Sequence, residues 1–531
     1  MASRRDELNA YTFAKRRTVA AFLQPSATGT EEGAPRPLRA VVPGLVVGAL
    51  ILAGFGAWGL LDPKAPKGWD APGTKVIVGK DSTTRYVVLK TGDQVRLHPV
   101  LNLASARLLL DPGKFAVIQV DDKTLDGGTP PRGPIIGIPY APDRLPSAKD
   151  AGAAKRWAVC QQPGGNGKGV QTAAFVLADR EAGLMDDKRR LTDGQVLYVQ
   201  TKVPNGDGTE TTSRYLVDAA GTKYKFPEKT SDSATLTTAL VGSGTPQQVS
   251  QQWLDTLNTG EELAFPKLDN GKPGDDAKVP GLATDDNKVG MVLLAQTGSG
   301  PQHYVVQAGK VSRVSPFTAW LLINAPATER LNMNGQAKEV DLQSLRPDGS
   351  QFYEKKRWPK ARSGQVNGNT GAAAATASQG GSVRNTVCNV LRSVDGQGRT
   401  TMSTWAGPGF PVDISASGTS SYVTPGTGLL YTQFQGKQAK GGGALFLVTD
   451  TGLRYAVQAN GDSDAEQSEI GASPQPGAGE GKTDGPPEAS QAQARLGYKD
   501  VTPALVPIVW SEFLSKGPRL DTNAARQPQG S

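Results

Sequence analysis

One long uncharged segment limits what this chain can fold into. Residues 40–61 read AVVPGLVVGALILAGFGAWGLL, which is 22 residues without a charged side chain. As an α-helix this segment would be about 33 Å long, which matches the thickness of the hydrocarbon core of a bilayer. The segment therefore predicts one transmembrane helix near the N-terminus, with most of the chain on one side of the membrane.

The charges that flank this segment predict its orientation. The basic residues before it are Arg4, Arg5, Lys15, Arg16, Arg17, Arg36 and Arg39. Because the positive flank of a span stays in the cytoplasm, we expect residues 1–39 inside and the remainder outside, as in a single-pass protein of the inner membrane. The alternative is a cleaved signal peptide, since residues 57–59 resemble a cleavage site. The long preceding region and the long apolar run favour an uncleaved anchor.

Two further features of the N-terminal part indicate contacts in or at the membrane. Residues 6–23 predict an amphipathic helix, in which Lys15, Arg16 and Arg17 would contact either anionic lipid or a partner protein. Small residues recur along the span and would let another helix approach closely, although they are also common in spans by chance. These residues are Gly44, Gly48, Ala49, Ala53 and Ala57.

The exported part repeats one pattern four times. Stretches that begin near residues 75, 194, 290 and 428 each predict strand, Gly-rich turn, strand, turn, short strand and then helix. Three pairs place a capping hydroxyl before a proline and predict helix starts, namely Thr245–Pro246, Ser315–Pro316 and Thr502–Pro503. The tryptophans that follow them, Trp253, Trp320 and Trp510, are expected to anchor the cores.

These patterns predict an α+β fold in which four small repeat modules flank a β-rich central domain. The expected parts are a cytoplasmic basic tail (1–39), the transmembrane helix (40–61), module one (62–120), the first part of the central domain (121–185), module two (186–265), module three (266–345), the second part of the central domain (346–415, with a flexible run at 363–381), module four (416–517, with a disordered insertion at 460–493) and a flexible tail (518–531).

Each part of the expected central domain contains one cysteine. Outside the cytoplasm two thiols can form a disulfide, so Cys160 and Cys388 are expected to pair. On the chain-entropy view, closing such a long loop would contribute at most about 4–5 kcal/mol. Two separate buried thiols are the alternative.

The sequence offers little support for catalysis or for nucleic-acid binding. A net charge of +8 over 531 residues is too dilute for a nucleic-acid surface, and two His with two Cys are too few for common metal sites. Gly481-Lys482-Thr483 lacks the first glycine of a phosphate loop, and prolines follow where a helix would have to begin. The paired carboxylates Asp121–Asp122, Asp186–Asp187 and Asp285–Asp286 are interpreted as solvated turn acids. We therefore expect no catalytic residues, cofactor or metal.

Several stretches together resemble one family. They are NAYTFAKRRTVAAFLQP before the span, then LHPVLNLASARLLL, RGPIIGIPYAPDRLP and RWAVC, followed by the imperfect repeats and a second lone cysteine. Over nearly its whole length the chain resembles EccB, the single-span core component of type VII (ESX) secretion systems of actinobacteria. It departs from the family pattern at Tyr140, where a small residue is expected, and in its longer acidic insertion at 460–493.

The resemblance implies a structural subunit of a secretion membrane complex, with an extracytoplasmic platform braced by a disulfide. Implied partners are the EccC motor, EccD, EccE and a nearby mycosin protease, with several copies forming a ring. Some members carry an ATPase label, for which the residues of this chain give no support. The alternative is a stand-alone membrane-anchored protein whose repeats bind the cell wall, with peptidoglycan as its ligand.

Overall fold

The computed structural model describes residues 3–23, 37–61, 65–164, 169–228, 230–368, 383–414, 420–436, 443–458, 470 and 491–529. The chain divides into two compact units. One consists of Met1–Trp69 with Gln119–Gly127, and the other of Asp70–Ile118 with Gly128–Ser531.

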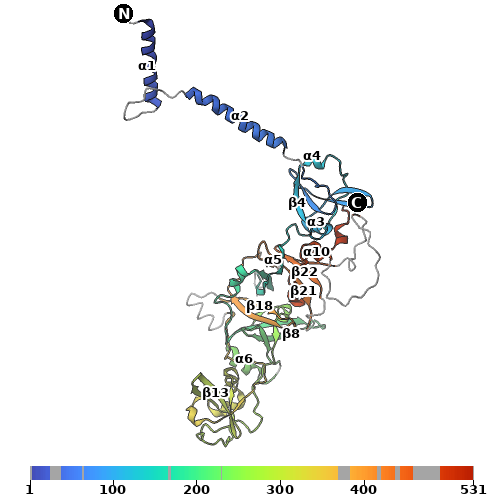
Figure 1. The fold of residues 1–531 in the computed structure, drawn as a ribbon. Coiled ribbons are helices and arrows are strands. Elements are labelled where there is room, and N and C mark those ends of the chain that lie inside the picture. The colour runs from blue at the N-terminus through green and yellow to red at the C-terminus, as the bar shows by residue number, and fades with distance from the viewer. Residues whose placement is uncertain are drawn as a thin grey trace. The chain divides into compact units, whose positions relative to one another are not determined.

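The first unit contains two long helices (Figure 1). The predicted N-terminal helix is present as α1 (Arg4–Leu23), and its large apolar side chains are exposed. Helix α2 (Pro37–Leu61) contains the uncharged segment. Within the described parts of the chain, no helix combines the length and the hydropathy expected of a membrane-crossing segment. The short helix α4 (Asp122–Leu125) completes this unit.

The second unit is a mixed α+β assembly, and its described strands form five sheets. The central sheet has the order β19-β18-β5-β6-β20. Its strands are β5 (Arg156–Pro163), β6 (Val170–Leu177), β18 (Thr386–Val394), β19 (Thr400–Gly407) and β20 (Ser420–Val423). Two segments of the chain that are more than 200 residues apart therefore lie side by side in one sheet.

Both faces of the central sheet are buried, which explains why its strands are apolar on both sides. On one face Trp157, Val159 and Val387 belong to a core that also contains Trp253 and Trp510. The opposite face contains both cysteines and Trp405, together with Phe175.

Three further sheets share one order of strands. In each, a three-stranded antiparallel meander carries a short parallel strand on both edges. The second sheet contains β7 (Gln195–Pro204), β8 (Glu210–Val217), β9 (Thr222–Lys225), β10 (Gln247–Gln248) and β11 (Asn258–Thr259), with β17 (Gly364–Gln365) beside β7. The third contains β12 (Val292–Thr297), β13 (Gly300–Gln307), β14 (Lys310–Val314), β15 (Lys338–Glu339) and β16 (Pro347–Gln351). The fourth contains β21 (Gly428–Phe434), β22 (Leu445–Thr449), β23 (Leu453–Ala456), β24 (Ala504–Pro507) and β25 (Ser515–Lys516).

The first sheet is related but shorter, with the order β3-β2-β1-β4. Its strands are β1 (Lys75–Gly79), β2 (Arg85–Thr91), β3 (Gln94–Pro99) and β4 (Ala116–Val120). Single parallel bridges from Leu97 to Arg132 and from Val100 to Ile136 occupy the outer edge of β3. Residues 128–137 therefore complete this first sheet, although the sequence assigned them to the central domain.

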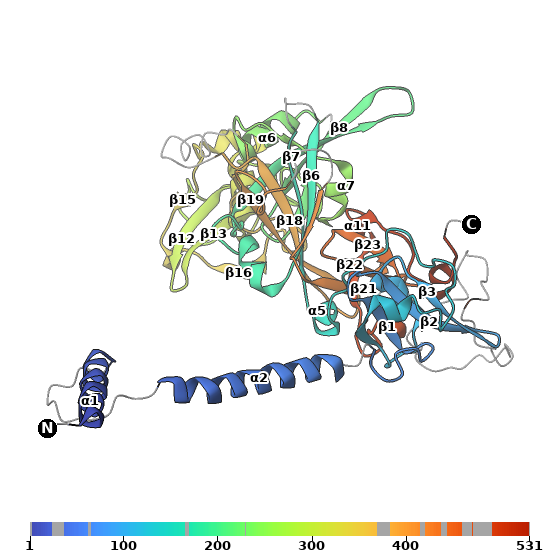
Figure 2. The same cartoon turned by 90° about the horizontal axis from the view of Figure 1, so that it is seen from above.

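Helices connect the strands in the same chain order in the related sheets. They are α3 (Leu103–Leu109) for the first sheet, α6 (Ser233–Val241) and α7 (Gln251–Asp255) for the second, α8 (Pro316–Ile323) with the 3₁₀ turns η3 (Pro326–Leu331) and η4 (Leu342–Ser344) for the third, and α10 (Gln491–Arg495) and α11 (Ile508–Ser511) for the fourth. The remaining ones are α5 (Ala148–Gly152), η2 (Asp179–Met185) and α12 (Thr522–Ala525). In Figure 2 the β7–β8 hairpin is seen to extend beyond the other strands of its sheet.

Only one of the three predicted helix starts is correct. Ser315 caps α8 by accepting a hydrogen bond from the Thr318 N–H, and Pro316 is the first helical residue. After Pro246 the chain instead forms β10, because the exposed edge of β7 needs backbone partners, and α7 begins later with Ser250 as its cap. After Pro503 the chain likewise forms β24 before α11 begins.

Two stretches expected to be flexible are ordered where the structure describes them. Residues 518–529 contain the short helix α12. Leu520 and Ala525 are buried in the core of the first sheet, because these apolar side chains complete that core. Asn367, at the end of the described part of 363–381, is buried and bonds both backbone groups of Tyr198. Most of 460–493, including Gly481-Lys482-Thr483, lies outside the described residues.

Candidate functional site

The structure places the predicted site residues in four elements, two of which are neighbouring strands. Cys160 and Cys388 are directly opposite each other in β5 and β18 and form a disulfide with an S–S distance of 2.02 Å. Lys15, Arg16 and Arg17 lie exposed on α1. The predicted packing residues Gly44, Gly48, Ala49, Ala53 and Ala57 all belong to α2. Which surfaces these helices contact stays a prediction.

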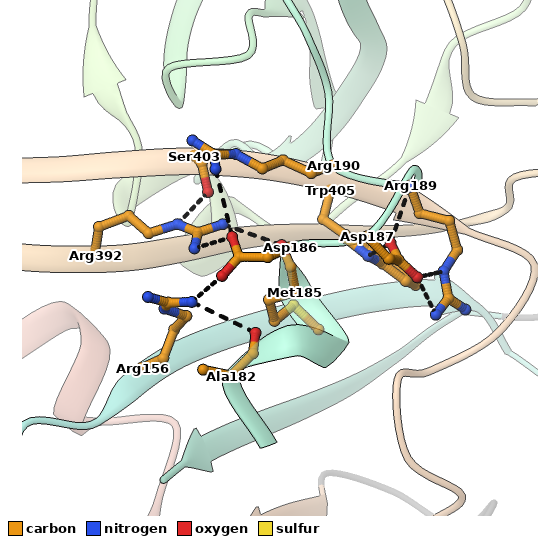
Figure 3. Close-up of polar contacts among 10 residues, drawn as sticks. All are labelled: Arg156, Ala182, Met185, Asp186, Asp187, Arg189, Arg190, Arg392, Ser403 and Trp405. Atoms are coloured by element: carbon orange, nitrogen blue, oxygen red, sulfur yellow. Dashed lines mark hydrogen bonds and ion pairs between the residues drawn. The ribbon is translucent and has the colours of Figure 1, made fainter. Parts of the chain in front are cut away.

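A cluster of charged side chains lies at one end of the central sheet (Figure 3). The Asp186 carboxylate, which follows η2, is paired with the guanidinium groups of Arg156, Arg190 and Arg392. Arg392 also donates to the Ser403 hydroxyl at 2.7 Å and to the Met185 carbonyl at 3.0 Å. We call these four charged residues the Asp186 cluster.

The backbone holds this cluster in place. The loop after η2 runs along the free edge of β19, where the Leu191 N–H donates to the Thr404 carbonyl at 2.9 Å and the Ala406 N–H donates to the Arg189 carbonyl at 3.0 Å. Arg156 and Arg392 lie on β5 and β18, which are neighbours in the sheet. Since every member is attached to a paired strand or to its edge, the cluster has a fixed geometry.

The positive charges of the Asp186 cluster outnumber the negative ones. Three arginines surround one carboxylate, and the side chain of Arg392 is only 12% exposed. Burial lowers the pKa of Arg392; its hydrogen bond to Asp186 opposes this shift, whereas the neighbouring charges of Arg156 and Arg190 add to it. The cluster therefore keeps an excess of positive charge.

Asp187 forms a separate pair beside the cluster. It accepts hydrogen bonds from the Arg189 guanidinium, from the Arg189 N–H at 2.9 Å and from the Trp405 indole at 3.2 Å. Burial alone would raise the pKa of Asp187, but these bonds and the Arg189 charge together lower it. The Arg189 guanidinium lies 4.9 Å from the Trp405 ring centre, so this pair also covers the face of the sheet that carries the disulfide.

A cavity of about 980 Å³ adjoins the cluster. Its wall combines the loop at 186–196, the β8–β9 turn and the segment at 358–361. The larger apolar residues that line it are Leu191, Val196, Tyr224, Trp358 and Met402. Three cations, Lys188, Arg190 and Lys360, and four acids, Asp186, Asp187, Asp193 and Asp218, are among the other lining residues. A cavity of this size is within the range of ligand-binding sites.

Sequence reasoning missed this site. The sequence predicts solvated acids at Asp186 and Asp187. Two of their arginine partners follow directly in the chain, but Arg156 and Arg392 are far away in sequence, so no spacing pattern indicates the cluster. Asp286 was misread in the same way, since it is buried and pairs with Lys338 at 2.7 Å. The run KRR at 188–190 directly after Asp187 is the one signal that could have indicated a charged cluster.

The two histidines have structural environments. His98 is buried in β3, where its Nδ1 lies 3.1 Å from the Pro134 carbonyl, and His303 is half-buried in β13. Burial lowers the pKa of both. Across the described residues, no group of three or more His, Cys, Asp or Glu side chains is arranged to hold a metal ion.

Comparison with known proteins assigns the chain to a family. The family described as "Type VII secretion system ESX-1, transport TM domain B" matches residues 1–530. The Mycobacterium tuberculosis protein named "ESX-5 secretion system ATPase EccB5" is 26% identical over 98% of this chain and 92% of its own length. The M. tuberculosis protein named "ESX-2 secretion system ATPase EccB2" is 30% identical over 61% of this chain and 59% of its own length.

Solved structures share the fold. A chain in a structure titled "Structure of an intact ESX-5 inner membrane complex" has a TM-score of 0.53 and 22% identity, covering 100% of this chain and 96% of that one. A chain in "Structure of EccB3 dimer from the ESX-3 core complex" has a TM-score of 0.54 and 20% identity, covering 85% and 99%. Because the family match extends over almost every residue, the chain belongs to the EccB family of type VII secretion system proteins.

Proposed function

We propose that this chain is a structural subunit of a type VII (ESX) secretion membrane complex. The observation that carries the proposal is the family match over residues 1–530, together with relatives whose structures were solved inside an ESX-5 inner membrane complex. In this role the chain would act through position and contacts rather than through chemistry. The partners implied by the resemblance are EccC, EccD, EccE and a mycosin, with several copies of this chain in a ring.

We further propose that residues 40–61 span the inner membrane, with residues 1–39 in the cytoplasm and the sheets outside. The uncharged segment and its basic flank support this topology. The Cys160–Cys388 disulfide supports it too, since disulfides persist in oxidising compartments. A reporter fused after Ser531 should be active only outside the cytoplasm, and activity in the cytosol would contradict the topology.

The four related sheets support a platform built from copies of one unit. Three of them share their strand order, and the first differs only in its outer edge. A small unit of this kind buries too little apolar surface to be stable alone, so packing against the central sheet or against a neighbouring unit is expected. This arrangement would present a broad surface to other proteins, while the central sheet and the contacts between neighbouring units keep the units together.

Affinity purification from detergent-solubilised membranes tests the subunit role. The tagged chain should recover other membrane proteins of the secretion system in stable amounts. Gly48→Leu should reduce that recovery, because a large side chain would block a close helix approach in the span. A chain that is recovered alone, and that instead binds isolated cell wall, would support the stand-alone alternative.

The ATPase name of the relatives leads to a separate test. The only Gly-Lys-Thr of this chain lies outside the described residues, and its sequence lacks the first glycine of a phosphate loop. We expect purified protein to show no ATP hydrolysis above that of a Lys482→Ala variant. Turnover that this substitution abolishes would contradict the non-enzymatic role.

A further inference from the structure

His98 is a buried imidazole that uses only one of its two nitrogens. Its side chain is 1% exposed, and Nδ1 lies 3.1 Å from the Pro134 carbonyl oxygen. Because a carbonyl oxygen can only accept, Nδ1 carries the proton of the neutral ring. Nε2 is buried and has no hydrogen-bond partner among the described residues. A proton added to Nε2 would therefore bury an N–H group and a positive charge without an acceptor in this part of the structure.

The described surroundings of the imidazole supply no compensating negative charge. Its cross-strand partner is Val87 of β2, and Gly133 lies so close that an added Cβ would come within 2.2 Å of the ring carbon Cε1. The charged residue that acts on the ring is Arg96 of the same strand, which is positive as well. The guanidinium of Arg132 lies 5.3 Å from the centre of the Tyr86 ring, on the other face of the sheet.

The segment at 131–137, which packs against this ring, connects two parts of the chain. On one side both backbone groups of Leu97 in β3 bond to it, each at 2.9 Å. On the other side Gln529 donates to it twice, from its N–H to the Ile135 carbonyl at 2.8 Å and from its side-chain amide to the Gly137 carbonyl at 2.9 Å. The segment therefore links β3 to the C-terminal end of the described chain.

The second and fourth sheets have a tyrosine at the equivalent place. Tyr224 lies against Gly260, and Tyr455 lies against Gly517. In all three sheets the N–H of this glycine donates to the carbonyl of the residue before the ring, at 2.8–2.9 Å. A phenol stays neutral at physiological pH, whereas an imidazole, with an ordinary pKa near 6.5, changes its charge there. Of these three rings, the one in the first sheet is the ring that mild acid can protonate.

We propose that His98 is an acid-sensitive latch on the edge of the first sheet. When Nε2 takes up a proton, the ring leaves its buried position and the segment at 131–137 separates from β3. Residues 527–529, which are bonded to this segment, loosen with it. The latch depends on the fold of the first sheet and not on the partners of the chain, so it can fail while the subunit role stands.

The direction of the pH dependence follows from the environment of the ring. Burial lowers the pKa of His98; the hydrogen bond to the Pro134 carbonyl opposes this shift, and the charge of Arg96 adds to it. In the open state the ring is solvated and its pKa returns to about 6.5. The closed state is therefore fully favoured above about pH 7 and weakens as the pH falls through 6.5. Between pH 7.5 and pH 5 the opening constant can rise by up to about 30-fold.

Hydrogen exchange of the full chain in detergent micelles, followed by mass spectrometry, tests the latch. The peptides to follow contain residues 131–137 and 520–529, with rates corrected for the intrinsic effect of pH on exchange. In the wild type both segments should lose protection, by several-fold up to about 30-fold, between pH 7.5 and pH 5, whereas β18 should keep its protection. His98→Asn, whose amide can still donate to the Pro134 carbonyl but does not titrate, should show no such loss.

The second histidine of the chain provides a matched control. His303→Asn should leave the pH dependence of both segments unchanged, because His303 lies in the third sheet. Thermal unfolding at pH 7.5 checks that each variant is folded, and His98→Gln takes the place of His98→Asn if that variant is not. Unchanged protection in the wild type at pH 5 would overturn the proposal, as would an equal loss in the wild type and the His98 variant. A loss confined to 131–137 would overturn the link to the C-terminal residues.

Discussion

The second and fourth sheets are attached to the molecule differently from the third, although all three have the same strand order. Trp253 of α7 and Trp510 of α11 both enter the core on one face of the central sheet. The third sheet instead has cores of its own, and its helix α8 packs against the second sheet through Phe317 and Leu321. Sheets of the same topology can therefore pack directly on the central sheet or attach only through another sheet. The position of the large apolar side chains on their helices decides which.

A second difference concerns the parallel edge of each sheet. In three sheets a ring on the third strand lies against a glycine of the parallel edge segment, and an added Cβ there would come within 2.2–2.4 Å of the ring. These pairs are His98 with Gly133, Tyr224 with Gly260, and Tyr455 with Gly517. In the third sheet this place is polar, because Asp348 accepts from Ser312, Ser350 and Lys310, each at about 3 Å. The edge is thus closed by packing in three cases and by hydrogen bonds in one.

The largest expected effect concerns the central attachment. Trp253→Ala should reduce the free energy of unfolding by about 3–5 kcal/mol, because it removes a fully buried indole and its hydrogen bond to the Val159 carbonyl. Denaturant unfolding of the full chain followed by far-UV circular dichroism measures this. Trp320→Ala, which removes a partly buried indole at the attachment of the third sheet, is the matched control and should cost clearly less. An equal loss of unfolding free energy in both variants would contradict the distinction between sheets that pack on the central sheet and a sheet that attaches through another one.

The edge glycines should come next in size. Gly260→Ala should destabilise the protein by about 1–3 kcal/mol, since the new methyl group would overlap the Tyr224 ring. Gly298→Ala, in the open β12–β13 turn of the third sheet, has no atom within 4 Å of the added group and should change stability by less than about 0.5 kcal/mol. A neutral Gly260→Ala would show that the ring and the edge are not tightly packed.

The polar edge of the third sheet should have an acid-dependent stability. Although burial opposes the shift, hydrogen bonds from the serines and Lys310 lower the pKa of Asp348 to about 2. The unfolded value is near 3.9, so the stabilisation, roughly 2 kcal/mol at most, is complete above about pH 4 and is lost as the pH falls through 2. The Asp348→Asn variant should be less stable than the wild type above about pH 4, and the difference in their free energies of unfolding should disappear as the pH falls to about 2. A deficit that stays constant down to pH 2 would contradict this assignment.

The sequence predicted the periodic parts of the fold and missed those that depend on tertiary contacts. Strand meanders and the disulfide partners could be inferred from alternation, turn residues and compartment. The Thr–Pro pairs at 245 and 502 resemble Ser315–Pro316 in sequence, but these two pairs precede short edge strands, which a pattern of two to four residues cannot reveal. The Asp186 cluster was missed for a related reason, since Arg156 and Arg392 are neighbours only through the pairing of β5 with β18.

The segment at 518–531, which the sequence predicts to be a flexible tail, is a second case in which tertiary contacts override the sequence pattern. Its composition is polar, and only the contact of Leu520 and Ala525 with the core of the first sheet reveals that this segment is ordered. The two ends of the second unit therefore lie together, because residues near 76–110 and near 520 share one core.

Native mass spectrometry of the detergent-extracted assembly, with its proteins identified, tests the central claim most directly. If this chain is a subunit of a secretion membrane complex, it should be found in a particle much heavier than its own 55.7 kDa, together with at least one other membrane protein of the system. A particle that contains a single copy of this chain and no other protein would contradict the account.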